Sequence, residues 1–149
     1  MNYTKINDNF SISGALTFAE LAELQQQGVD VIINSRFDGE DAKQISSRQY
    51  QNEVEALGMK YVKVPVKSLV YPSQAIQRFS ETITKPTLKV HAFCRSGKRV
   101  AHLWALAQAS YRSPQAIIDI YAAAGVDIGA IVQQLQDAAH NNRYTFQKR

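Results

Sequence analysis

The sequence predicts an α/β fold with a mostly parallel central sheet flanked by helices. Short apolar runs rich in β-branched residues alternate along the chain with longer segments of helical periodicity. Such alternation favours parallel strands joined by helical crossovers. The 149 residues are enough for one domain, and no linker divides them. We therefore expect a single domain over residues 1–149, with a polar and basic tail, residues 140–149, that frays.

The expected strands are recognised by their apolar and β-branched composition. They comprise Phe10–Ser13, Val29–Ser35, Lys60–Val66 and Thr87–Phe93. Val29–Ser35 is an apolar run of the kind found in buried strands. Lys60–Val66 alternates polar and apolar residues and contains Pro65, which favours a position near the edge of the sheet.

The expected helices are delimited by caps and breakers. Thr17 and Glu20 have the spacing of a capping box, and Gly28 is placed to end the helix that follows. Ser73 is expected to cap a helix that Pro86 terminates. Further helices are predicted over 47–57, 100–111, from 113 to about 124, and 128–139.

Composition and charge narrow the function classes. The net charge of +4 is mild and the basic residues are scattered, so we expect no nucleic-acid partner. No apolar run approaches the roughly 18 residues of a membrane span, and the polar N-terminus has no apolar signal core. The default expectation is a cytoplasmic protein that binds no membrane. The lone cysteine, Cys94, excludes a disulfide framework, and we expect no metal and no cofactor.

The sharpest feature is the segment Cys94–Arg99, called here the Cys94 loop, between a predicted strand and a predicted helix. Its backbone N–H groups, with Gly97 permitting a tight turn, would form an anion-binding nest at a helix N-terminus. The same field favours the thiolate of Cys94, which is a nucleophile. We therefore expect a small anionic or phosphorylated substrate, with Cys94 and Arg99 as catalytic residues. The substrate-binding residues of the loop are predicted to be Arg95, Ser96, Gly97, Lys98 and Arg99.

The Cys94 loop resembles the anion-binding loops of cysteine-based phosphatases and of rhodanese sulfurtransferases. The wider chain, from about residue 5 to residue 130, resembles a bacterial family of phosphatase-like domains that is also found fused to a metallo-β-lactamase-like hydrolase domain. The matching segments are Ile6-Asn7-Asp8 to Ser13-Gly14, Ile32–Arg36 through Asp38-Gly39-Glu40, Val64-Pro65-Val66, and the Cys94 loop. The resemblance implies a three-layer sandwich of the protein-tyrosine-phosphatase-like kind.

The chain departs from the tyrosine-phosphatase pattern at several positions. Phe93, and not histidine, precedes the cysteine, and only four residues separate Cys94 from Arg99, as in rhodanese. Val100 follows the arginine where these phosphatases tend to carry a hydroxyl. No carboxylate lies in the stretch 67–71, where their general acid often lies.

The nearest acidic residues are Asp38, Glu40 and Asp41, which follow the strand that ends at Ser35. Because the carboxyl ends of parallel strands open onto one crevice, this loop is expected beside Cys94. We choose Asp38 as the catalytic residue that protonates the departing oxygen, and an exposed acidic turn is the alternative. Arg36 is expected to bind substrate as a second cation or to pair with these carboxylates.

Three functions are compatible with these residues. The first is a phosphatase that forms a phosphocysteine at Cys94. The second is a rhodanese-type sulfurtransferase that carries a persulfide on Cys94, which the short loop and the missing acid favour. The third is a non-catalytic domain that binds an anion or a partner. The resemblance of the whole chain favours the phosphatase. The sequence does not indicate an oligomeric state.

Overall fold

A computed structural model describes the backbone of residues 1–147 and the side chains of residues 1–140. Five strands form one sheet in the order β1-β2-β5-β3-β4. Strands β2, β5, β3 and β4 are parallel, and β1 pairs antiparallel with β2 at one edge. The strands are β1 (Thr4–Asn7), β2 (Phe10–Ser13), β3 (Val31–Asn34), β4 (Lys60–Lys63) and β5 (Val90–Phe93). The predicted α/β fold class is confirmed.

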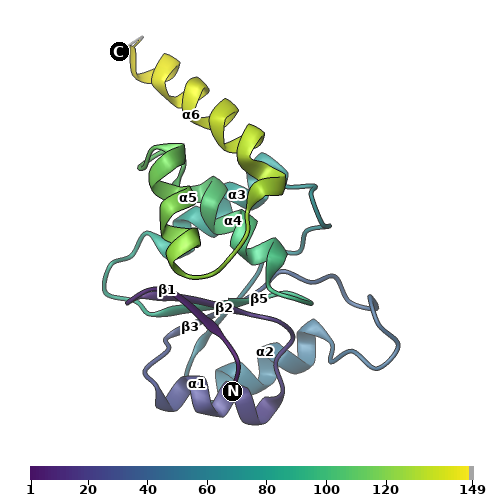
Figure 1. The fold of residues 1–149 in the computed structure, drawn as a ribbon. Helices are drawn as coiled ribbons and strands as arrows, with labels where there is room; N and C mark the ends of the chain where they lie inside the picture. Colours follow the sequence, from purple (N-terminus) through teal and green to yellow (C-terminus); the bar gives the residue numbers. More distant parts are fainter. Residues whose placement is uncertain (148–149) are drawn as a thin grey trace.

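Helices cover both faces of the sheet (Figure 1). Helices α1 and α2 lie on one face, and α3, α4, α5 and α6 lie on the other. The helices are α1 (Phe18–Gln26), α2 (Ser47–Ala56), α3 (Ser73–Ile83), α4 (Lys98–Gln108), α5 (Pro114–Ala123) and α6 (Val132–Gln147), and a 3-10 turn, η1 (Gly129–Ile131), precedes α6. The side chains after residue 140 lie outside the described residues, so the fraying of the tail stays a prediction. None of the described helices is both long and apolar enough to cross a membrane.

Several details differ from the sequence prediction. Helix α6 continues to Gln147, beyond the predicted end at residue 139. Strand β1 was not predicted, because only Ile6 of its four residues is buried and the strand carries no apolar pattern. Ser73 is the first residue of α3 and does not cap it; Pro72 holds the cap position in an extended conformation. Helix α4 begins at Lys98, earlier than predicted, because Gly97 acts as its N-terminal cap residue.

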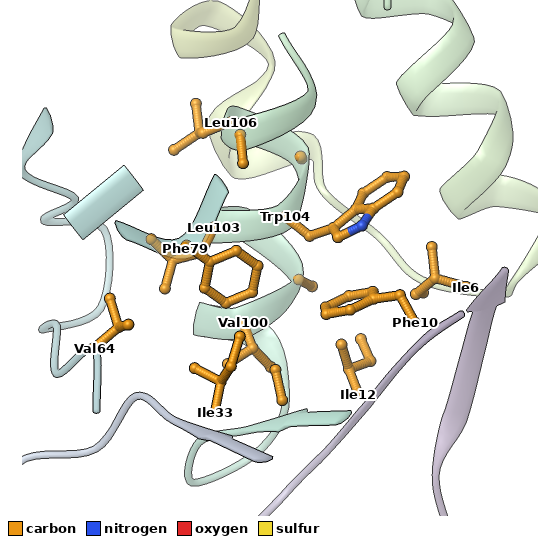
Figure 2. Close-up of a cluster of buried hydrophobic side chains, with 14 of the residues drawn as sticks. Ile6, Phe10, Ile12, Ile33, Val64, Phe79, Val100, Leu103, Trp104 and Leu106 are labelled. Atoms are coloured by element: carbon orange, nitrogen blue, oxygen red, sulfur yellow. The ribbon is translucent and has the colours of Figure 1, made fainter. Parts of the chain in front are cut away.

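Helix α4 is the central helix of the larger hydrophobic cluster and is buried from Arg99 to Ala107. Trp104 stacks on Phe10 of β2, with ring centroids 5.8 Å apart, and meets Tyr121 of α5 edge-on at 5.5 Å. Figure 2 shows α4 surrounded by side chains of β2, β3 and α3. A helix enclosed in this way has a fixed position above the sheet. The Cys94 loop, which leads into α4, is therefore fixed as well.

Replacement of Trp104 by alanine should lower the free energy of unfolding by about 3–5 kcal/mol, because the ring contacts to Phe10 and Tyr121 are lost and a cavity remains. Urea denaturation measures this change. Tyr111→Ala is the matched control, since that ring is 67% exposed and its loss should cost no more than about 0.5 kcal/mol. Equal losses in the two variants would show that α4 is not the centre of the core.

Candidate active site

The Cys94 loop lies at the carboxyl edge of the sheet, between the end of β5 and the start of α4. The ends of two neighbouring strands flank it. The Cys94 N–H donates to the carbonyl oxygen of Ser13 at 3.4 Å, and the Ser35 N–H donates to that of Phe93 at 3.0 Å. The loop that follows Ser35 thus lies beside the Cys94 loop, where ligands of parallel α/β folds bind.

The Cys94 sulfur accepts a hydrogen bond from the N–H of Gly97, with an N···Sγ distance of 3.1 Å. Gly97 has a φ of +95°, a left-handed conformation that glycine adopts without steric cost. Because Gly97 caps α4, the positive end of the helix dipole is directed at the sulfur. These donors face the sulfur of Cys94, whose side chain is fully buried.

The outer side of the Cys94 loop rests on the turn after β2. The Ala15 N–H donates to the carbonyl oxygen of Arg95 at 3.3 Å. A Cβ atom at Gly14 would lie 2.9 Å from the same oxygen, closer than side chains approach a backbone atom. Gly14 is therefore required for the close approach of the two segments.

His91 of β5 is completely buried, and its side chain joins β5 to β2 just before this turn. The Ser13 hydroxyl donates to the Gly14 oxygen at 2.9 Å, so it accepts from the Nε2–H of His91 at 2.8 Å. Nδ1 then accepts from the Ser11 hydroxyl at 2.7 Å. Burial lowers the pKa of His91 to about 3, and the ring is neutral at ordinary pH. His91 therefore fixes the end of β2 that leads into the turn on which the Cys94 loop rests.

The Arg99 guanidinium, at the end of the Cys94 loop, is held by two segments that follow neighbouring strands. Nη1 and Nη2 donate to the two carboxylate oxygens of Glu40 at 2.8 and 2.7 Å, and Nη1 also donates to the Val66 oxygen at 2.8 Å. Three of the five N–H groups of this arginine are thereby used. The Nε–H and the second Nη2–H have no acceptor among the described residues, and they can bind two oxygens of an anion.

Glu40 is the residue that orients Arg99, and the sequence analysis did not assign it this role. Its carboxylate also accepts from the Phe37 N–H at 2.9 Å and from Arg36 Nε at 3.1 Å. The hydrogen bonds from Arg99 are the main cause that lowers the pKa of Glu40 to about 2, against the opposing effect of burial. Only the position of Glu40, after a strand adjacent to the cysteine strand, signalled a role.

The cations predicted to bind substrate differ in exposure and in their ion pairs. Arg36 is 4% exposed and pairs with Glu40 and with Asp41, whose Oδ2 lies 2.8 Å from its Nη2. Of the two readings of Arg36, the structure thus shows pairing with the carboxylates. Arg95 is exposed, and its Nη2 lies 3.3 Å from Asp41 Oδ1. Lys98 is also exposed, on the first turn of α4.

The Asp38 carboxylate accepts a hydrogen bond from the N–H of Ser47, with an O···N distance of 2.7 Å. Ser47 is the first residue of α2, so Asp38 anchors the start of that helix. This contact does not involve the Cys94 loop. The role of Asp38 as an acid stays a prediction.

The sequence analysis also missed the pair formed by Tyr71 and His102. The Tyr71 hydroxyl lies 2.6 Å from Nδ1 of His102. Tyr71 belongs to the stretch 67–71 that was notable only for its lack of a carboxylate, and His102 lies on α4. No signal in the sequence indicated that these residues meet.

The groups around Cys94 suit an anion. Backbone N–H groups and a guanidinium are donors only, and donors do not bind metal ions. In the part of the chain whose side chains the structure describes, no three His, Cys, Asp or Glu residues are grouped as metal ligands would be.

The free energy of unfolding should fall in two steps as the pH decreases. Between pH 6.5 and about pH 3, the unfolded chain binds a proton at His91 that the folded chain excludes, a loss of about 2 kcal/mol by pH 5. His102, whose pKa burial also lowers, adds to the same step. The Glu40 contribution is present above pH 4.5 and is lost as the pH falls towards 2. Denaturant titrations at several pH values measure both steps. Glu40→Gln should abolish only the second, and a flat profile between pH 6.5 and 5 would contradict the His91 assignment.

Residues 2–111 match the family described as the phosphatase-like domain of beta-lactamase hydrolase-like proteins. Over 109 residues the chain is 31% identical to the beta-lactamase hydrolase-like protein of Agrobacterium fabrum, a match that covers 73% of this chain and 25% of that protein. A relative from Xylella fastidiosa is 32% identical over 108 residues, covering 72% and 25%. The chain thus spans about a quarter of the length of the curated relatives it matches.

Solved structures show the same architecture. A candidate phosphatase of Neisseria meningitidis is 28% identical, with a TM-score of 0.78 over 91% of this chain and 96% of that one. PTPMT1 has a TM-score of 0.74 at 14% identity, over 99% and 100% of the two chains, which shows a shared fold. The matches in sequence establish that this chain belongs to the family of phosphatase-like domains of beta-lactamase hydrolase-like proteins.

Proposed function

We propose that the chain is a cysteine-dependent phosphatase that hydrolyses a small phosphorylated substrate through a phosphocysteine at Cys94. The observation that carries this proposal is the pair of unused N–H groups on Arg99, which Glu40 holds beside the capped N-terminus of α4. The N–H of Gly97 contacts the sulfur in the same loop. Membership of a phosphatase-like family supports the proposal.

In the first step of the proposed reaction, the Cys94 thiolate attacks the phosphorus atom of a phosphate monoester. The P–O bond to the leaving group breaks, and its electron pair goes to the leaving oxygen, which takes a proton. The loop N–H groups and Arg99 stabilise the charge on the remaining phosphoryl oxygens. In the second step, water attacks the phosphocysteine, phosphate departs, and the thiolate is regenerated.

The other charged residues support this chemistry in different ways. Glu40 orients Arg99, and Arg36 is held against Glu40 and Asp41. Exposed cations of the loop, Arg95 and Lys98, raise the local concentration of an anionic substrate. Asp38, the proton donor chosen from the sequence, anchors α2 with the same carboxylate that would carry the proton.

The unchanged protein should hydrolyse 4-nitrophenyl phosphate, and Cys94→Ser should reduce the rate to background because the nucleophile is lost. Arg99→Lys retains the charge but loses the planar fork, and should lower kcat by about 10²–10³. Release of nitrophenolate measures both. Activity retained in Cys94→Ser would refute the cysteine mechanism. Turnover of thiosulfate with cyanide, without phosphatase activity, would favour the sulfurtransferase instead.

Glu40→Gln should weaken inhibition by inorganic phosphate by about tenfold or more, because hydrogen bonds between charged groups contribute about 1.5–3 kcal/mol and Arg99 is then less firmly oriented. The inhibition constant for phosphate in the same assay measures the change. The control is Glu55→Gln, since Glu55 is exposed on α2 and its side chain accepts a hydrogen bond from Gln51, away from Arg99. An unchanged constant in Glu40→Gln would show that Arg99 needs no partner.

A further inference from the structure

A second polar pair adjoins the proposed catalytic groups and has no part in the chemistry described so far. The hydroxyl of Tyr71 and Nδ1 of His102 are 2.6 Å apart, and their rings meet edge to face with centroids 5.6 Å apart. His102 is buried on α4, three residues after Arg99, so the two side chains lie on the same side of the helix, one turn apart.

The segment from Val66 to Tyr71 is fixed to α4 at both of its ends. At the first end, Arg99 Nη1 donates to the Val66 oxygen at 2.8 Å. At the second end, Tyr71 contacts His102. A tight turn, closed by the N–H of Val70, connects them. Tyr71 is therefore held near the residues that bind the anion.

Tyr71 also lies within electrostatic range of Cys94 and Arg99. Burial is the largest cause that raises the pKa of Tyr71. A backbone hydrogen bond from Leu69 opposes it, the charge of Cys94 raises the pKa further, and Arg99 lowers it. The phenol therefore carries its proton at neutral pH, as a proton donor must before the reaction. The ring packs against the hydrophobic cluster that includes Cys94.

His102 can hold the Tyr71 hydroxyl in a productive orientation. Burial lowers the pKa of His102, and the charge of Lys98 lowers it further, so the ring is neutral at neutral pH. In the tautomer with hydrogen on Nδ1, His102 donates to the Tyr71 oxygen. The O–H of Tyr71 is then available to another acceptor.

We propose that Tyr71 donates the proton to the leaving oxygen and that His102 is the positioning residue that orients its hydroxyl. The inference rests on the proposed phosphatase function. As the P–O bond breaks, its electron pair goes to the leaving oxygen, which takes the Tyr71 proton. The tyrosinate regains a proton from the water that attacks the phosphocysteine in the second step.

The contacts of the nearby carboxylates are consistent with Tyr71 as the proton donor. The carboxylates of Asp38, Glu40 and Asp41 are engaged by Ser47, Arg99 and Arg36 respectively, and none of them contacts the segment 67–71. Tyr71 occupies the stretch in which the sequence has no carboxylate. A phenol is a stronger acid than an aliphatic alcohol, so proton transfer to a departing alkoxide is favourable.

The test compares a leaving group that needs a proton with one that does not. Tyr71→Phe should lower kcat/KM for glycerol 2-phosphate by about 10²-fold or more and leave that for 4-nitrophenyl phosphate nearly unchanged. Tyr111→Phe, a change on an exposed ring, is the matched control and should affect neither substrate. His102→Asn retains a polar group near the Nδ1 position and should preserve most of the activity towards glycerol 2-phosphate, whereas His102→Ala should lose it.

Several outcomes would overturn the inference. An equal loss on both substrates in Tyr71→Phe would make Tyr71 structural. A loss confined to glycerol 2-phosphate in Asp38→Asn, and absent in Tyr71→Phe, would assign the proton to Asp38. If Tyr71→Phe does not fold by circular dichroism, the two His102 variants decide, and equal behaviour would refute the positioning role. If the unchanged protein hydrolyses neither phosphate, the proposed function fails and this inference fails with it.

Discussion

The pairing of Arg99 with Glu40 is the interaction on which the site depends. Desolvation of a buried guanidinium costs free energy unless its N–H groups donate to acceptors. Removal of its carboxylate partner leaves the charge buried and unpaired, which destabilises the fold. The Arg99 side chain is only 11% exposed, and Glu40 provides both of its carboxylate oxygens. The pair joins the start of α4 to the loop after β3. The contact that joins these two segments is also the contact that orients the guanidinium proposed to bind the anion.

The sheet supplies the framework that makes this pairing possible. Because β3 and β5 are parallel neighbours in register, Asn34 lies opposite Phe93, and the residues that follow each strand emerge side by side. Strand β2 flanks β5 on its other side and provides the Gly14 turn against Arg95. Helix α4, enclosed by the core, fixes the direction in which the loop N–H groups point. Each part of the site therefore comes from a different strand end.

A feature could be predicted from the sequence where its residues lie close together along the chain. The Cys94 loop and the Thr17 capping box consist of residues that are close in the sequence, so both could be predicted. The structure contains the capping box and a helix that starts after Gly97. The partner of Arg99 lies 59 residues away, within a cluster of three acidic residues that composition alone does not distinguish. Tyr71 and His102 are likewise separated by 31 residues, and only the packing of the segment 67–71 against α4 brings them together. Strand β1 was not predicted because it is defined by its hydrogen bonds to β2 and lacks an apolar pattern in the sequence.

The complete burial of Cys94 has a kinetic consequence. The sulfur has no exposed surface in this structure, so a reagent reaches it only during a local opening of the protein. At low reagent concentration, the rate of modification reports how often the open form is populated; at high concentration, it reaches a plateau that equals the opening rate. The chain contains no second cysteine to add a background signal. Labelling of this single thiol therefore measures the local opening that exposes the Cys94 sulfur.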